Sequence, residues 1–205
     1  MKIEWEIQEA GWLDLIIEIN GTYYFYNYRW TYDVLGEISN ILVNLIPLYE
    51  DSFNRKSCFL ADSEPIIDLW EFQKKDDILF IDITSFKGVD LNNIVIEKNL
   101  FKNYNINKNL LRAHILEEQK IQIEFNLFVK EMVCSFDSLL KKYGIVGYRE
   151  NMVRFEFPLS FYLILKNYIS TKRKFDLKEI PAGEKQISSA LASDLQLEIN
   201  FLLKE

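Results

Sequence analysis

Residues 2–28 read KIEWEIQEAGWLDLIIEINGTYYFYNY, and their pattern decides the fold class. Apolar and polar residues alternate over residues 3–8 and again over 13–19, as expected of strands with one buried face. Asn20-Gly21 tolerates positive φ and so suits a tight hairpin turn. Residues 22–30 are rich in aromatic side chains of high β-propensity. We therefore predict a three-stranded antiparallel meander over residues 3–29.

A helix is predicted over residues 33–46. Thr31 or Asp33 can cap its N-terminus, and Glu37 suits the positive end of its dipole. Pro47 cannot continue a helix and should end or kink it. The predicted apolar stripe consists of Val34, Leu35, Ile38, Ile41, Leu42 and Leu45.

A second group of strands is predicted at Lys56–Ala61, Pro65–Gln73 and Ile78–Thr84, with a turn at residues 75–77. The simplest assembly is an α+β fold in which one antiparallel sheet of about five or six strands carries helices on one or both faces. Frequent asparagines over residues 85–117 predict loops and at most one strand, at Ile94–Ile96.

The second half of the chain has a helical period. A helix is predicted from about Glu117 to Tyr143, followed by Gly144 as its terminating glycine. Another should begin at Pro158 and continue to Ile169. The tail from Glu184 to Leu203 fits a helix, although residues 195–203 also alternate like a strand. We expect one domain over 1–205, with a sheet-rich half (1–85) and a helix-rich half (117–205).

Composition and charge limit the classes of partner. The net charge is −7, and residues 1–100 hold 18 acidic against 8 basic residues. An acidic surface repels phosphate backbones and attracts basic proteins, so nucleic acid is a poor candidate partner. The start of the chain does not resemble a signal peptide, and no apolar run approaches the ~20 residues that cross a bilayer. We expect a cytoplasmic protein without a membrane partner.

Residues for catalysis or metal binding are sparse. His114 is the single histidine, and no glycine-rich phosphate loop or nucleophile motif is present. We predict that Cys58 and Cys134 are reduced and buried. Clustered carboxylates allow a hydrolytic pair or a cation site, but we favour solvated loop charge; they are Asp62, Glu64, Asp68, Asp76 and Asp77. We expect no catalytic residue, metal or cofactor.

The aromatic strand over residues 22–30 leaves two arrangements open. Its side chains alternate between two faces, so one core can bury only about half of them. In one arrangement the C-terminal helices cover the other half and make a three-layer sandwich, and we favour this arrangement. In the other, these side chains are exposed as a protein-binding surface.

Three features carry a family resemblance: Gly11-Trp12, the Asn20-Gly21 hairpin, and Tyr32-Asp33-Val34-Leu35 at the start of an apolar helix. Over residues 1–85 they resemble a loosely defined group of bacterial proteins that share this opening and an α+β sheet. In size and charge the chain is also similar to the small acidic immunity proteins encoded beside polymorphic bacterial toxins. That resemblance implies a protein that masks a toxin domain without chemistry of its own.

The predicted function is therefore non-catalytic binding of a basic protein. Acidic groups should speed the encounter, and aromatic anchors should slow dissociation. The predicted contact residues are Glu4, Glu6, Asp14, Glu18, Tyr24, Tyr26, Trp30, Asp62, Glu64 and Asp68. Two alternatives remain: an enzyme or small-ligand binder that uses scattered carboxylates, and a homodimer formed through the exposed sheet face.

Overall fold

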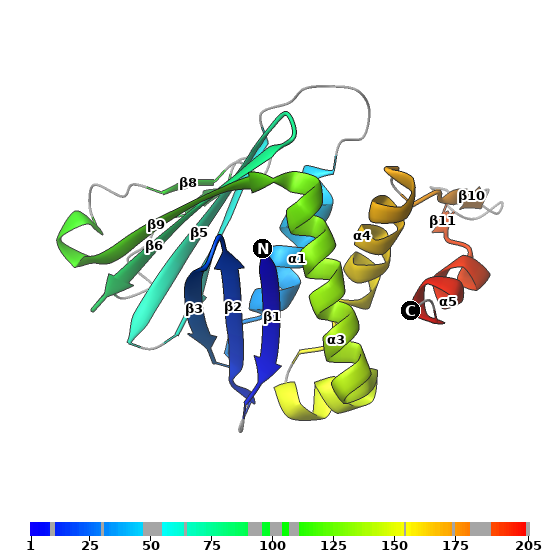
Figure 1. Ribbon diagram of the computed structural model, residues 1–205, viewed down its shortest axis with the longest axis horizontal. Helices are drawn as coiled ribbons and strands as arrows, with labels where there is room; N and C mark the ends of the chain where they lie inside the picture. The colour runs from blue at the N-terminus through cyan, green and yellow to red at the C-terminus, as the bar shows by residue number, and fades with distance from the viewer. Residues whose placement is uncertain are drawn as a thin grey trace, which may run out of the picture.

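The protein is an α+β structure in which two antiparallel sheets pack against a layer of helices (Figure 1). The computed structural model describes residues 1–8, 11–29, 31–46, 55–63, 65–89, 96–98, 104–106, 111–153, 155–173, 175–180 and 190–203. Helix α3 lies beside β1, and α4 lies between α3 and α5 (Figure 1).

The first sheet is the predicted meander. It consists of β1 (Lys2–Ile7), β2 (Leu13–Ile19) and β3 (Thr22–Tyr28), in that order. Asn20 and Gly21 both have positive φ, 51° and 80°, which is the conformation that a tight hairpin turn requires. This turn pairs Ile19 with Thr22 and thereby sets the register of the whole hairpin.

Helix α1 (Val34–Leu45) also lies where the sequence predicts it. Asp33 is its N-cap, because its Oδ1 accepts a hydrogen bond of 2.9 Å from the Gly36 N–H. The predicted apolar stripe is buried along its whole length. Local capping and the 3.6-residue period are therefore sufficient to place this helix.

The second sheet has four strands in the order β4 (Arg55–Asp62), β5 (Ile66–Lys75), β6 (Ile78–Lys87) and β9 (Ile115–Glu124). The prediction of a single sheet of five or six strands is therefore wrong. Strand β3 does not add to an edge of this sheet. Its inner residues lie on the sheet's face instead, with the Tyr26 ring 5.0 Å from the Trp70 ring.

Strand β9 also corrects the prediction that the helix begins near Glu117. Ile121 and Ile123 alternate with polar neighbours, and β9 pairs with β6 along its length. In the sequence, Ile121 also fits the apolar stripe of the following helix. Its position therefore agrees with a strand period and with a helical period, and the pattern alone does not separate the two. Helix α3 (Phe125–Met152) begins only after this strand.

The helical layer otherwise follows the predicted order. The φ of Gly144 is 67°, and its conformation interrupts α3 where a terminating glycine was predicted. Helix α4 (Leu159–Thr171) begins directly after Pro158. In the tail, helix α5 (Leu195–Leu203) confirms the helical prediction over 195–203 and shows that the strand alternative is wrong there. Strand β11 (Ala190–Ala192) lies where a helix was predicted, so the helical prediction is wrong for those residues.

Short elements occupy the segment that was predicted as loops. They are β7 (Ile96–Lys98), β8 (Tyr104–Ile106) and a 3₁₀ helix at Arg112–His114. Strand β10 (Lys178–Ile180) pairs with β11. The prediction of at most one strand is wrong, because β7 and β8 pair with each other. Residues 94 and 95 of the predicted strand lie outside the described residues.

One hydrophobic cluster joins the inner faces of both sheets to α1, α3, α4 and α5. A second, smaller cluster lies on the opposite face of the four-stranded sheet, around Leu69 and Phe86. Within the described part of the chain, no helix has both the length and the apolar character needed to cross a membrane.

Candidate functional site

The outer face of the three-stranded sheet carries the feature that best fits binding. Cross-strand pairing places nine side chains in three rows on this face. The rows are Lys2–Glu18–Tyr23, Glu4–Ile16–Phe25 and Glu6–Asp14–Asn27. We call these nine residues the acidic–aromatic face. Their strand neighbours Ile3, Trp5, Leu15 and Ile17 point inward and are buried.

The acidic–aromatic face has four carboxylates against one ammonium group, that of Lys2. Lys2 pairs with Glu4, and Glu6 pairs with Lys142 of α3 at 2.8 Å. Asp14 accepts hydrogen bonds from Gln8, at 2.8 Å, and from Asn27. These are contacts between partly or fully exposed groups, so they hold the carboxylates in place without removing them from water.

Two aromatic rings lie along the β3 edge of this face. Tyr23 is 67% exposed and Phe25 is 61% exposed, whereas Phe is among the residue types most often fully buried. The favoured three-layer arrangement is therefore wrong, because no described helix covers this side of the sheet. Ile16 lies between Glu4 and Phe25 and joins the apolar surface.

The predicted aromatic anchors lie on the other face. Tyr24 is half-buried against the core, and Tyr26 is buried with its hydroxyl bonded to Gln119. Their burial corrects their assignment to an exposed contact surface. The register set by the Asn20-Gly21 turn places Tyr23 opposite Glu18 and Phe25 opposite Ile16, so these two are the exposed aromatic residues of β3. Trp30 lies outside the described residues.

The second predicted acidic group does not form one surface. Asp62 and Asp68 lie on opposite faces of the four-stranded sheet, since Asp62 pairs with Ile67 and Asp68 with Ala61. Asp68 is 4% exposed and accepts a 2.6 Å hydrogen bond from Ser85, which corrects its assignment as a contact residue. Glu64 lies outside the described residues. Asp76 is in the tight turn between β5 and β6.

Asp68 belongs to a buried polar network between the two sheets. Burial raises the pKa of Asp68, while hydrogen bonds from Ser85 and Tyr28 oppose that rise. The Tyr28 hydroxyl also accepts a 2.9 Å hydrogen bond from Trp70 Nε1. Because Tyr28 is fully buried, substrate cannot reach this network, and its evident role is to join β3 to β5.

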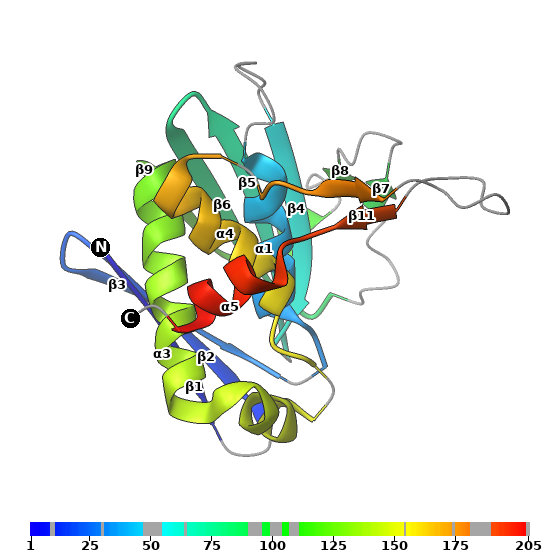
Figure 2. The ribbon, with the colours of Figure 1, turned by 90° about the vertical axis from the view of Figure 1, so that its right-hand side faces the viewer.

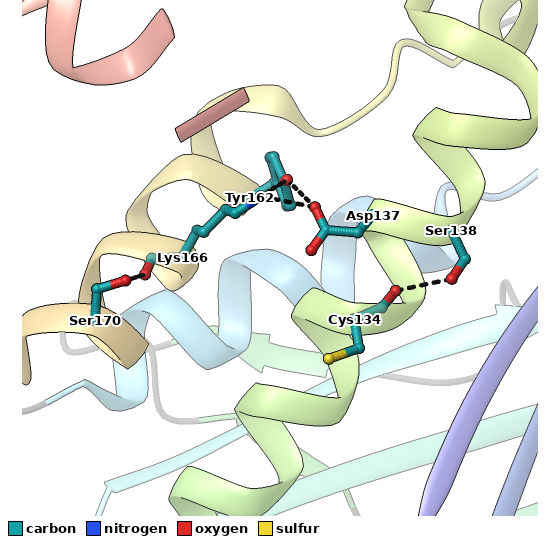
Figure 3. Close-up of polar contacts among 6 residues, drawn as sticks. All are labelled: Cys134, Asp137, Ser138, Tyr162, Lys166 and Ser170. Atoms are coloured by element: carbon teal, nitrogen blue, oxygen red, sulfur yellow. Dashed lines mark hydrogen bonds and ion pairs between the residues drawn. The ribbon is translucent and has the colours of Figure 1, made fainter. Parts of the chain in front are cut away.

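A second polar cluster joins α3 to α4 (Figure 3). Lys166 Nζ lies 2.8 Å from Asp137 Oδ1 and 2.7 Å from the Tyr162 hydroxyl, which itself donates to Asp137. Burial, and then Asp137, raise the pKa of Tyr162, so the phenol is held protonated. A general base would need the opposite shift. The cluster therefore acts as a polar link between two helices.

The two thiols and the histidine lie on three separate elements. Cys58 is buried as predicted, but Cys134 is exposed on α3, so the prediction of burial is wrong for Cys134. Neither cysteine forms a disulfide. Partial burial and the nearby Glu131 and Asp137 raise the pKa of Cys134, which disfavours the thiolate nucleophile. His114 is exposed in the 3₁₀ helix. Within the described ranges, no three His, Cys, Asp or Glu side chains are grouped to hold a metal ion.

Comparisons with protein-family models, curated proteins and solved structures gave no match to this chain. The resemblance to immunity proteins accordingly stays a prediction.

Proposed function

We propose that the protein is a non-catalytic binding protein that holds a basic protein partner on its acidic–aromatic face. A bacterial toxin domain is the partner class that the predicted resemblance to immunity proteins favours. The observation that carries the proposal is the exposure of Tyr23 and Phe25 among four carboxylates. Aromatic residues are the commonest energetic anchors of protein interfaces, and carboxylates around them select a basic partner.

The charge of the face also bears on self-association. In a two-fold dimer the same patch meets its own copy. Glu4, Glu6, Asp14 and Glu18 would then face a second set of four carboxylates, with Lys2 and Lys142 from each copy to compensate. Like charges brought together across an interface disfavour the complex. A heterologous basic partner therefore fits this face better than a second copy of the chain.

Co-expression with the protein encoded by the neighbouring gene tests the proposal. A complex should survive gel filtration, and its association kinetics can be measured by biolayer interferometry. Raising the salt from about 50 mM to about 500 mM should slow association, because the Debye length falls from about 14 Å to about 4 Å. Glu4→Lys with Glu18→Lys should lower the on-rate by about tenfold.

Matched variants separate the face from general surface effects. Phe25→Ala should speed dissociation, whereas Val146→Ala, at an apolar site on α3 that is 73% exposed, should not. Glu118→Lys on exposed β9 is the control for charge reversal. The proposal fails if no complex forms, or if the Glu4/Glu18 and Phe25 variants bind as the two controls do.

A further inference from the structure

The side of β3 that faces away from β2 is an unguarded sheet edge, which we call the free edge of β3. Natural proteins guard edge strands with charged side chains, proline, bulges or a covering element, because an edge exposes backbone N–H and C=O groups. Strand β3 has seven residues, none of them charged or proline. Among the residues that the structure describes, no strand pairs with this edge. Figure 2 shows the β3 side of the meander projecting past β9 and α3.

The other edge strands of the two larger sheets are guarded. Strand β1 lies beside α3 and alternates charged with apolar residues (Figure 1). The pairing of the edge strand β9 with β6 shifts register between Ser85 and Phe86. The charged residues of the edge strands β1, β4 and β9 are Lys2, Glu4, Glu6, Arg55, Lys56, Asp62, Glu117, Glu118, Lys120 and Glu124. The free edge of β3 is therefore the exception in this fold, and an unguarded edge is a template for another strand.

The hairpin turn identifies the backbone groups that lie at this edge. A two-residue turn makes its flanking residues, Ile19 and Thr22, a hydrogen-bonded pair. Along an antiparallel ladder such pairs alternate with pairs that share no hydrogen bond. The N–H and C=O groups of Tyr23, Phe25 and Asn27 consequently point away from β2. These three residues also belong to the acidic–aromatic face, so an added strand would meet open backbone groups and exposed rings together.

Carboxylates lie one strand behind this edge on the outer face. Glu18 is opposite Tyr23, and Asp14 is opposite Asn27. An added strand would lie two strand spacings from them, about 10 Å. A Lys or Arg side chain extended across β3 covers most of that distance and crosses an aromatic ring, whose face attracts a cation. The outer face therefore selects basic side chains from the added strand.

Glu117 of β9 adds negative charge on the inner side of β3. The Tyr26 hydroxyl donates to Gln119, and Gln119 donates in turn to Glu117 at 2.9 Å. Burial, and then the charges of Asp68 and Glu117, raise the pKa of Tyr26. An added strand would thus meet carboxylates on both faces. A second copy of β3 would bring the same carboxylates with it, so charge favours a basic segment over self-pairing.

We propose that the free edge of β3 accepts an extended segment of the basic partner, which adds antiparallel as a fourth strand and directs Lys or Arg side chains over Tyr23 and Phe25. This inference rests on the proposed function, because it describes how the partner of the acidic–aromatic face is held. Backbone hydrogen bonds supply the affinity in this mode, and alternate side chains supply the specificity. Antiparallel addition continues the existing ladder and is the more stable pairing per residue.

A synthetic peptide of alternating Lys and Thr, as long as β3, tests the edge in the full chain. Amide hydrogen exchange measured by NMR is the readout, because strand addition protects particular N–H groups. The Tyr23, Phe25 and Asn27 amides should exchange rapidly in the free protein and about tenfold more slowly when the peptide is nearly saturating. A peptide of alternating Glu and Thr is the charge control and should bind at least about tenfold more weakly.

Two N-methylated peptides separate strand addition from binding to the surface alone. In an antiparallel pair, residues on the same face as Tyr23, Phe25 and Asn27 direct their own N–H groups toward β3. N-methylation of every Lys should therefore remove the protection and weaken binding at least about tenfold. N-methylation of every Thr blocks only the far edge of the peptide and should leave the affinity within about twofold.

Phe25→Pro and Phe25→Ala form a matched pair in the protein. Both remove the ring, but only proline removes the N–H at the free edge. Phe25→Pro should bind the Lys–Thr peptide several-fold more weakly than Phe25→Ala, with melting temperatures that confirm folding. The N-methylated peptides decide the question if Phe25→Pro does not fold.

Three results overturn strand addition. The first is a lack of protection of all three amides at about 1 mM Lys–Thr peptide. The second is equal binding of the two N-methylated peptides. The third is protection without peptide that rises with protein concentration, since the occupant is then a second copy. A co-expressed partner that depends on Glu4 and Glu18 but leaves these amides unprotected refutes strand addition and leaves the proposed function standing, whereas the absence of any complex refutes the proposed function.

Discussion

The two sheets place their aromatic residues in opposite environments. In the four-stranded sheet Phe59, Trp70 and Phe72 stack at ring separations of 5.9 and 6.0 Å and are buried beneath the other elements. On the outer face of the three-stranded sheet Tyr23 and Phe25 are more than half exposed. The same residue types therefore stabilise the fold in one sheet and remain available for contact in the other, depending on what covers them.

The largest effect is expected for Trp70→Ala. Trp70 is fully buried, stacks on Phe59 and Phe72, and donates to Tyr28. Its removal should lower the free energy of unfolding by about 3–5 kcal/mol, because it leaves a cavity and an unmatched hydroxyl. Urea denaturation measures the change. A loss below about 1 kcal/mol would show that the junction between the sheets is not tightly packed.

Asp68→Ala should cost about 1–3 kcal/mol, because Ser85 and Tyr28 lose a buried acceptor. Burial raises the folded-state pKa of Asp68 above its ordinary value of 3.8, so the folded protein binds the proton more tightly than the unfolded chain. Ionisation therefore removes stability as the pH rises through the window above 3.8. The difference in unfolding free energy between wild type and variant should narrow from pH 4 to pH 7. A difference that widens would contradict this sign.

Gly21→Val should destabilise by about 1 kcal/mol or more, because a β-branched residue resists a φ of 80°. The space around Gly21 is open, so the backbone conformation accounts for the whole effect. Gly147→Val is a contrasting variant, since this helical glycine has no positive φ. Thermal denaturation compares the two, and a neutral Gly21→Val would mean that the hairpin tolerates another turn type.

The smallest effect on stability is expected for Phe25→Ala. Phe25 is 61% exposed on the outer face, so its truncation should change the unfolding free energy by no more than about 0.5 kcal/mol. Urea denaturation alongside Trp70→Ala gives the direct contrast between the sheets. A loss of several kcal/mol would show that the ring supports the fold and would remove it from the proposed binding face.

The sequence predicted most accurately the elements that depend on neighbouring residues. The Asn20-Gly21 turn, the alternation of β1 and β2, the Asp33 cap and Gly144 all act within a few residues along the chain. Their physical causes are backbone sterics, capping and side-chain period, which a local stretch expresses completely. The acidic residues of the outer face were identified for the same reason, because they alternate with buried positions in β1 and β2.

Only the tertiary structure decided which strands share a sheet and which faces are covered. Strand β9 pairs with β6, which lies about forty residues earlier in the chain. Strand β3 packs on the face of the second sheet through Tyr26 and Tyr28. In the sequence, Asp68 does not differ from other acidic residues. Its hydrogen bonds come from Tyr28 and Ser85, which lie on other strands. Burial depends on what distant segments bring to a site, so a local pattern gives the alternation of a strand but does not say which of its faces meets water.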